Sequence, residues 1–298
     1  MSRQTIQGIY DTEASVVSHR PSGSIAHIIT FRCEEIARAA RPVQFFTVST
    51  RPVSRDGGVD NPSLDPILRR PFGFSSVRPE QCEFDAIYQV VGRGTKLISE
   101  LRPGDKVRIL GPLGTPINAR DFSAKTVILV GGGQGLPPLY HLAPLLSKAG
   151  LEVVVIAGAR AKDMLIMETA PCPLNRPIGD IKETIGLKPF VDSGIDCVVT
   201  LDDSAAGFLS GLATDPLEKY LEDRFDGGVE IICCGPMPML RAIAKMTEEK
   251  KVRCRLIMES RMGCALGACQ ACVCKTTGGY KRVCTEGPVF NAEEIVWD

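Results

Sequence analysis

Residues 259–290 read ESRMGCALGACQACVCKTTGGYKRVCTEGPVF and contain five of the twelve cysteines in the chain. Four of the five follow the pattern C-x4-C-x2-C, with eleven residues between the third cysteine and the fourth; they are Cys264, Cys269, Cys272 and Cys284. Clustered cysteines in an intracellular chain bind metal or carry out redox chemistry more often than they form disulfides. The stretch therefore predicts a metal centre.

The spacing of these four cysteines is that of plant-type [2Fe–2S] ferredoxins. Two irons need four thiolates, and a tight loop can wrap three of them around the cluster. Small residues at Gly263, Gly267 and Ala268 let backbone N–H groups approach the inorganic sulfides. A turn at Gly278–Gly279 lets the chain return with Cys284 as the fourth ligand. We therefore expect a [2Fe–2S] cluster in this segment.

A four-cysteine zinc site, within a binding module that is not an enzyme, is the alternative. Zinc sites usually show two C-x2-C-type pairs, whereas this stretch has one, so the spacing favours iron and sulfur. Cys274, two residues after Cys272, is expected to point away from the cluster as a small buried side chain. The remaining single cysteines are expected to be core or incidental: Cys33, Cys82, Cys172, Cys197 and Cys254.

The length of 298 residues suggests two domains with a small appendage. Lys+Arg and Asp+Glu both number 35, so the total charge does not imply a face for nucleic acid. No apolar run approaches the roughly 18–20 residues that a membrane-spanning helix needs. The N-terminal sequence MSRQTIQGIYDTEAS does not read as a secretory signal. We expect a cytoplasmic protein that binds neither nucleic acid nor membranes.

Residues 1–119 read as mostly β-structure. Ile25–Phe31, Val43–Val48 and Ala86–Val91 are apolar or alternating runs, and Pro, Gly and Asp clusters separate them. Short strands at this spacing are typical of a small antiparallel barrel. Residues 51–66, RPVSRDGGVDNPSLDP, are expected to be a long surface loop within this domain.

Residues 120–252 alternate between short apolar strands and helices, which predicts a parallel sheet covered on both faces. The expected strands are Thr126–Val130, Leu151–Ile156, Cys197–Thr200 and Val229–Cys233, and the expected helices are Pro137–Lys148 and Pro236–Lys250. Residues 253–298 form the cysteine-rich third part. The predicted fold is thus multi-domain, with an antiparallel β-barrel, an α/β parallel-sheet domain and a small C-terminal cluster domain.

Two glycine-containing turns follow strands of the second domain. Gly131–Gly135 reads GGGQG and precedes a helix that begins with Pro137 and Pro138, and Cys234-Gly235-Pro236 follows a later strand. Exposed N–H groups at a helix start, with glycines that allow close approach, suit a pyrophosphate. Parallel sheets bind nucleotides at the carboxyl ends of their strands. Each turn alone is as compatible with packing as with binding, but the two together favour a nucleotide.

A third element, RRPFGF at residues 69–74, is followed by VGRGT at residues 91–95. The order RRPF, VGRGT, GGGQG and CGP resembles the ferredoxin–NADP reductase superfamily, in which an Arg-x-aromatic-Ser element binds flavin and Cys-Gly-Pro faces the nicotinamide. With the C-terminal cysteines added, the chain resembles the electron-transfer subunits of NAD-dependent dihydroorotate dehydrogenases over nearly its full length. The block from Met262 to Phe290 is the most specific part of this resemblance.

The resemblance implies three cofactors: FAD, a [2Fe–2S] cluster and NAD. It implies that Arg70 contacts the flavin pyrophosphate and that Phe72 lies near the isoalloxazine, within an element completed by Pro71 and Gly73. It implies that Gly92, Gly94 and Thr95 bind the FAD phosphates. The NAD pocket would be shaped by Gly131, Gly132, Gly133, Gly135, Cys234, Gly235 and Pro236.

The chain departs from the family pattern in three places. Gly73 stands where a serine is usual, so only a backbone N–H could reach flavin N5. Thr200-Leu201-Asp202-Asp203-Ser204 differs from the simpler Thr-Asp-Asp-Gly, and the loop 51–66 is longer than expected. Arg160 could favour the 2′-phosphate of NADP, so the preference for NAD rests on the resemblance.

A related family has a similar layout, namely the small subunits of NADH-dependent ferredoxin:NADP oxidoreductases and of sulfide dehydrogenases. In that family the first cluster ligand is usually aspartate, so Cys264 favours the dihydroorotate family. A stand-alone NADH:acceptor reductase is a further alternative, because a sequence does not show a partner.

The resemblance implies an electron relay in pyrimidine biosynthesis. A partner subunit oxidises dihydroorotate on its own flavin, electrons pass singly through the cluster, and the FAD collects two and gives a hydride to NAD⁺. A flavin must stand between the cluster, which carries one electron, and nicotinamide, which takes two. No general base is needed in this chain. His19, His27 and His141 show no metal spacing and are expected to be surface or core residues.

Overall fold

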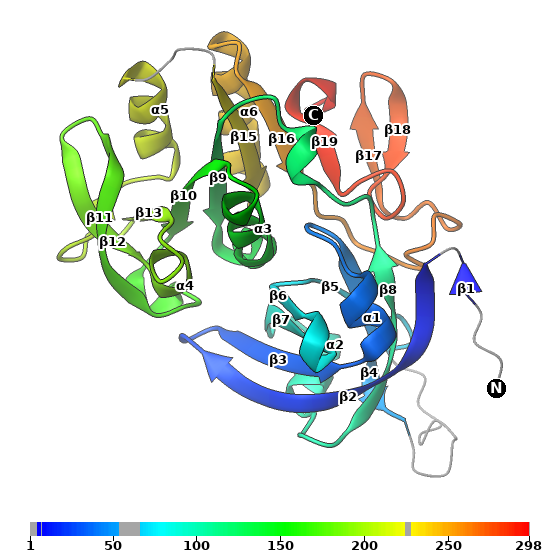
Figure 1. The fold of residues 1–298 in the computed structure, drawn as a ribbon. Helices are drawn as coiled ribbons and strands as arrows, with labels where there is room; N and C mark the ends of the chain where they lie inside the picture. Colours follow the sequence, from blue (N-terminus) through cyan, green and yellow to red (C-terminus); the bar gives the residue numbers. More distant parts are fainter. Residues whose placement is uncertain (1–4, 7, 54–65, 224–227, 298) are drawn as a thin grey trace. The chain divides into compact units, whose positions relative to one another are not determined.

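Residues 5–6, 8–53, 66–223 and 228–297 are described here in a computed structural model. The chain divides into two compact units, each with its own sheet (Figure 1). The antiparallel unit comprises Met1–Pro116, Glu259–Cys274 and Tyr280–Pro288. The parallel unit comprises Ile117–Met258, Lys275–Gly279 and Val289–Asp298. The first division falls three residues before the expected boundary at 119.

The antiparallel unit is built on an eight-stranded sheet with the order β5-β4-β8-β2-β3-β7-β6, in which β1 pairs with β2. All of its strand pairs are antiparallel. Its elements are β1 (Thr5–Ile6), β2 (Ile9–Ser22), β3 (Ala26–Arg32), α1 (Glu34–Ala39), β4 (Phe45–Pro52), β5 (Arg70–Gly73), β6 (Ser76–Arg78), β7 (Glu83–Gln89), α2 (Arg93–Ser99) and β8 (Lys106–Leu113). Of the expected loop 51–66, residues 54–65 lie outside the described residues.

The sheet curls, but its hydrogen-bond ladder does not close into the expected barrel. Among the described strands, β5 and β6 are the two ends of the sheet, and no ladder joins them. Only Phe74 and Ser75 separate these strands in the chain, so the two ends must lie close together. The Phe74 N–H donates to Gln44 O at 3.5 Å, and the Ser75 N–H donates to Asp85 O at 2.9 Å. Phe74 and Ser75 therefore connect β5 to β6 without a hydrogen-bond ladder between these two strands. The expectation of a closed barrel is corrected to a curled open sheet.

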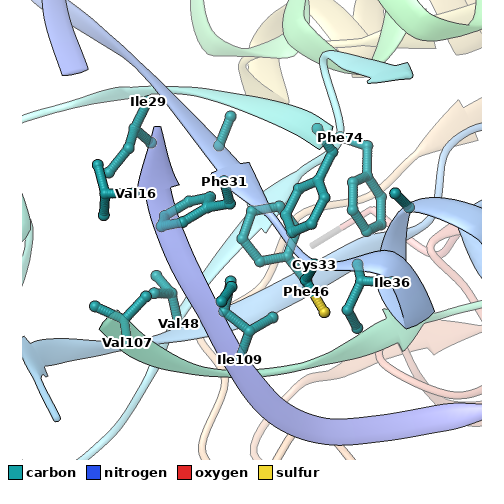
Figure 2. Packing of buried hydrophobic residues seen from close by; sticks show 14 of the residues in the cluster. Val16, Ile29, Phe31, Cys33, Ile36, Phe46, Val48, Phe74, Val107 and Ile109 are labelled. Carbon is teal, nitrogen blue, oxygen red and sulfur yellow. The ribbon is translucent and has the colours of Figure 1, made fainter. Parts of the chain in front are cut away.

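The core of this unit comes from the inward-facing residues of alternating strands. Residues two apart on a strand share a face, which brings Ile29 and Phe31 of β3 and Phe46 and Val48 of β4 into one cluster (Figure 2). The Phe46 ring lies 4.9 Å from the Phe74 ring, measured between centroids. Each such fully buried aromatic stabilises the fold by roughly 1.5–3 kcal/mol. Cys33 is buried in the same cluster, as expected for a core cysteine.

The parallel unit has a seven-stranded sheet with the order β14-β13-β10-β9-β15-β16-β19. Only the β16–β19 pair is antiparallel. Its elements are β9 (Thr126–Gly132), α3 (Pro137–Lys148), β10 (Glu152–Ala159), β11 (Thr169–Ile178), β12 (Ile181–Leu187), α4 (Lys188–Val191), β13 (Asp196–Leu201), β14 (Leu209–Ser210), α5 (Thr214–Asp223), β15 (Val229–Cys234), α6 (Met237–Glu249), β16 (Arg253–Ile257) and β19 (Val289–Asn291). No helix in the described ranges is long and apolar enough to cross a membrane.

The four strands and two helices expected between residues 126 and 250 are confirmed as β9, β10, β13, β15, α3 and α6, with small shifts at their ends. Chain order reverses at β9, because β10 lies on one side of it and β15 on the other. A crevice opens at the carboxyl ends of strands at such a switch point, and ligands bind there. Gly131–Gly135 begins with the last two residues of β9, and Cys234 is the last residue of β15.

Two features of this unit were not expected. The hairpin β11–β12 contains the proline-rich run TAPCPLNRPI, in which the prolines obscure a strand pattern. The segment 253–298 is also divided between the two units, since β16 and β19 extend the parallel sheet whereas Glu259–Cys274 and Tyr280–Pro288 belong to the antiparallel unit. Between them lie the cysteine loop and the hairpin of β17 (Val273–Thr276) and β18 (Gly279–Arg282).

Candidate functional site

The first two cysteines of the motif lie against each other in the antiparallel unit. The Cys264 N–H donates to Cys269 Sγ, and the Cys269 N–H donates to Cys264 Sγ, both at 3.4 Å. The Leu266 N–H donates to Cys264 Sγ at 3.4 Å, and this bond contributes most to lowering the pKa of Cys264 to about 7. Positive φ angles at Ala265, Gly267 and Gln270 wrap the loop tightly. The loop thus directs backbone N–H groups at sulfur.

The other two cysteines form a second, buried pair. Cys272 and Cys284 are 2% and 1% exposed, and the Val283 N–H donates to Cys272 O at 2.9 Å. Burial, followed by hydrogen bonding and charge from Cys272, raises the pKa of Cys284 to about 11. Within the described residues, no three His, Cys, Asp or Glu side chains gather as ligands of one metal ion. Two pairs of thiols fit a two-iron centre, which takes two protein ligands on each iron.

The segment after Cys284 is fixed to the end of β8. The Thr115 N–H donates to Gly287 O at 2.7 Å, and the Gln44 side-chain amide donates to Gly114 O at 2.8 Å. A Cβ at Gly114 would lie 2.7 Å from Cδ of Pro288, so only glycine fits there without movement. These contacts make the cysteine loop part of the antiparallel unit.

Arg70 of β5 lies directly on the start of α2. A Cβ at Gly94 would overlap its guanidinium group, and Arg70 Nη1 donates to Leu68 O at 2.5 Å. The Thr95 hydroxyl accepts from the N–H groups of Val91 at 3.0 Å and Gly92 at 3.2 Å, and it donates to Gly92 O at 3.0 Å. The structure therefore brings the RRPF and VGRGT elements together, with the Thr95 hydroxyl engaged inside the turn.

Phe72, the aromatic residue of the RRPF element, belongs to a group of rings. It is half-buried and stacks on Tyr88 of β7, with centroids 5.0 Å apart. Its edge meets Phe46 of the core at 6.3 Å between centroids. Strand β5 thus carries the Arg70 guanidinium and, two residues later, the Phe72 ring, which packs against Tyr88 and Phe46.

In the parallel unit, the two glycine-containing turns pack against each other. Strands β9 and β15 are neighbours, with Gly131 opposite Cys234. A Cβ at Gly135 would collide with the carbonyl of Cys234, and one at Gly235 would lie 3.1 Å from the Gly132 nitrogen. Met239 of α6 covers Gly132, with Sδ 2.9 Å from the position of a Cβ there. The glycines are needed because two backbones meet at this point.

Known proteins match this combination of features. Residues 259–296 match the family model described as the iron-sulfur cluster binding domain of dihydroorotate dehydrogenase B. The dihydroorotate dehydrogenase B (NAD(+)), electron transfer subunit, of Geobacillus sp. (strain WCH70) is 33% identical over 289 residues, covering 95% of this chain and 98% of the relative. The corresponding subunit of Bacillus caldolyticus is 40% identical over 240 residues, or 78% and 82% of the two chains. The chain belongs to this family.

Solved structures show the fold of the ferredoxin–NADP reductase superfamily. A chain in a structure of NADH-dependent reduced ferredoxin-NADP oxidoreductase, reported for flavin-based electron bifurcation, superimposes with a TM-score of 0.75 at 27% identity. That match covers 96% of this chain and 90% of the other. A ferredoxin NADP+ reductase from Neisseria gonorrhoeae shares the fold at a TM-score of 0.59 and 14% identity, covering 82% and 92% of the two chains. The resemblance to this superfamily is confirmed.

For a dihydroorotate dehydrogenase B electron transfer subunit, the expected site residues form three groups in the structure. Arg70 meets Gly94, Gly135 meets Cys234, and the four cysteines form two pairs. Their assignment to particular cofactors stays a prediction. Tyr88, which supports Phe72, was not among the expected site residues. Its signal was present, because Tyr88 shares a strand face with buried Ala86 in the expected strand.

Proposed function

We propose that this chain transfers electrons from a catalytic subunit, which oxidises dihydroorotate on its own flavin, to NAD⁺ in pyrimidine biosynthesis. The observation that carries the proposal is the paired set of four cysteines inside the matched cluster domain, within a family of electron transfer subunits. The name of that family implies a catalytic partner subunit. A cytoplasmic setting is part of the proposal, since all twelve cysteines are free thiols.

The cysteine loop would hold the cluster and receive the partner. Cys264 and Cys269 would bind one iron, and Cys272 and Cys284 the other, while the loop N–H groups stabilise the charge on sulfur. Cys269 and Leu266 are exposed, and no charged side chain occurs between Met262 and Cys274. A partner could therefore approach this loop closely without desolvating a charged side chain. The bound cluster and FAD would supply the one-electron and two-electron chemistry that side chains lack.

The residues of β5 and α2 would hold the FAD. The Arg70 guanidinium is suited to a pyrophosphate, since it carries a fixed charge and several donors in one plane. Gly94 leaves the space that this guanidinium occupies, and Gly92 and Thr95 shape the turn beside it. Phe72 offers a supported ring for the isoalloxazine, and Gly73 offers only its backbone there.

The turns of the parallel unit would hold NAD. Gly131–Gly135 and Cys234-Gly235-Pro236 lie at the switch point of the sheet, where parallel sheets bind nucleotides, and their glycines let the two turns pack directly against each other. Cys234 is fully buried at the end of β15, so it would shape the pocket rather than act as a nucleophile.

The experiment that tests the function uses the purified chain with a dihydroorotate-oxidising subunit. We expect flavin absorbance and two irons and two sulfides per chain. The reduced protein should give a rhombic electron paramagnetic resonance signal. The mixture should reduce NAD⁺ when dihydroorotate is added, and neither protein alone should do so. A colourless chain that binds one zinc would contradict the proposal. Efficient NADPH-linked reduction of ferredoxin would favour the family of the bifurcating oxidoreductase instead.

Gly94→Ala is expected to weaken FAD binding. The added methyl group would occupy the space of the Arg70 guanidinium, which must leave its place on α2. Loss of one charged hydrogen-bonding contact costs about 1.5–3 kcal/mol, or about tenfold to a hundredfold in affinity. FAD retained after gel filtration, and titration of the released protein with FAD, would measure the change.

Ser99→Ala, later in α2, is the matched control for this change. Its hydroxyl donates to Lys96 O at 2.6 Å within the same helix, and Ser99 is not one of the proposed FAD-binding residues. FAD binding should stay at the level of the unchanged chain. Equal effects of the two substitutions would show that Arg70 does not bind FAD in this place.

Asp202 and Asp203 are expected to favour NAD over NADP. The Asp202 N–H donates to Ala159 O at 3.2 Å and the Asp203 N–H to Arg160 O at 2.9 Å, so these exposed carboxylates lie at the ends of β10 and β13. An acidic residue at such a strand end accepts from the ribose 2′-hydroxyl and repels a 2′-phosphate. Replacing both by asparagine should raise kcat/KM for NADPH about fivefold, since one exposed charge pair is worth about 1 kcal/mol. Asp180→Asn, in the β11–β12 turn, should leave kcat/KM unchanged for both nucleotides.

A further inference from the structure

A row of three stacked rings lies behind the flavin element in the antiparallel unit. Phe72 stacks on Tyr88 with an interplanar angle of 29°, and Tyr88 stacks on His27 at 5.6 Å and 24°. Tyr88 is 2% exposed, whereas Phe72 is only half-buried. Phe72 and His27, the two ends of the row, are both half-buried, and Phe72 is the end that belongs to the flavin element.

His19 of β2 fixes the middle ring of this row. Its Nδ1 lies 2.9 Å from Leu101 O, and its Nε2 lies 2.9 Å from the Tyr88 hydroxyl. A carbonyl oxygen only accepts, so Nδ1 carries the proton, and in the neutral ring Nε2 accepts from Tyr88. Burial raises the pKa of Tyr88 and so keeps its hydroxyl protonated as a donor. Two hydrogen bonds thus connect β7 through His19 to the chain after α2.

His27, the third ring of the row, lies 5.4 Å from His19 between ring centroids. Burial, and then the charge of His19, lowers the pKa of His27. The ring on which Tyr88 stacks is therefore held in its neutral form.

We propose that His19 is a positioning residue for the flavin, which acts through Tyr88 to hold Phe72 in one orientation. This rests on the proposed function, in which Phe72 contacts the isoalloxazine. Without the bond to His19, the Tyr88 ring gains freedom and Phe72 loses its fixed support. The flavin would then sit less firmly, and its surroundings would change although no residue touching it has been replaced.

The test compares His19→Leu, Tyr88→Phe and the double variant of the full chain with its cofactors bound. Either single change should speed FAD release on dilution about threefold to tenfold, the effect of one lost hydrogen bond. Each should also alter the visible circular dichroism and the midpoint potential of the bound flavin in the same direction. The double variant should be no worse than the stronger single one, because both remove the same bond.

Two further variants separate positioning from general stability. His19→Gln keeps an amide that can donate to Leu101 and accept from Tyr88, so it should restore most of the flavin signal. Ser18→Ala removes a different bond between β2 and β3, from Ser18 to Thr30 at 3.0 Å, and should leave the flavin unchanged. If His19→Leu does not fold, Tyr88→Phe, which lacks only one oxygen, still carries the test.

The proposal is overturned if the flavin dichroism, potential and release rate of both single variants equal those of the unchanged chain. Additive effects of His19→Leu and Tyr88→Phe would overturn it as well, since they would show independent roles. An unchanged chain that binds no flavin would be a failure of the proposed function, and it is recognised before any variant is made.

Discussion

Cys284→Ser is expected to abolish electron transfer from a dihydroorotate-oxidising subunit to NAD⁺, while NADH oxidation by a small dye continues. Cys284 is almost fully buried beside Cys272, so its replacement leaves one iron with a single thiolate. A serine hydroxyl is a harder and far less acidic ligand than a thiol, and iron–sulfur clusters are held by thiolates. The dye reaction needs only the flavin and nicotinamide sites, which contain none of the cluster cysteines.

Iron and sulfide content, the visible spectrum of the cluster and the two rates together measure this effect. Cys274→Ser is the matched control, because Cys274 lies in the same segment but is not one of the four proposed ligands. It should keep the cluster and both activities. Loss of the cluster in Cys274→Ser, with retention in Cys284→Ser, would show that the fourth ligand has been assigned to the wrong cysteine.

Gly135→Ala is expected to disable the proposed nucleotide site and to destabilise the parallel unit. The added methyl group would collide with the carbonyl of Cys234, which is backbone and cannot swing aside as a side chain can. Overpacking of this kind costs about 1–3 kcal/mol in stability. It would also separate the two turns, and a displacement of about 1 Å costs on the order of a hundredfold in rate. NADH oxidation by a dye should therefore fall strongly while FAD content stays the same.

Gly150→Ala, after α3, separates crowding from backbone conformation in the same unit. A Cβ at Gly150 would meet nothing within 4 Å, but its φ of +89° is unfavourable for alanine by roughly 1–2 kcal/mol. This variant should lose some stability yet keep most of its activity with NADH. If Gly150→Ala were the more damaging of the two for NADH oxidation, the contact between Gly135 and Cys234 would not be what the proposed NAD site depends on.

Local chemistry explains what the sequence could predict. The cysteine spacing indicates a cluster because ligand geometry is encoded within a short segment, and the β9–α3 unit follows from a buried apolar run, glycines and prolines. The helix Pro137–Lys148 is found with the expected bounds. Arg70 and Gly94 could be placed in the same site only through the family resemblance, since 23 residues separate them.

Long-range arrangement explains what the sequence could not predict. Closure of the antiparallel sheet depends on which strands become its ends. Here Phe74 and Ser75 separate β5 from β6, and among the described strands these two remain the unpaired ends of the sheet. The strand Thr169–Ile178 was missed because its prolines argue against a strand in a sheet interior, whereas here it forms an isolated hairpin. His19 and Tyr88 are 69 residues apart, and only the pairing of strands brings their polar atoms to hydrogen-bonding distance.

The chain passes from one unit to the other after Pro116, and again after Met258, Cys274, Gly279 and Pro288. The cluster segment is therefore built into both units of the reductase fold and is not simply appended to its C-terminal end. Removing everything beyond Met258 would take away β19 and leave β16 as an open edge strand, which invites association with other chains. If the metal-binding segment were lost, by truncation or during evolution, another element would have to pair with or cover the exposed edge of β16.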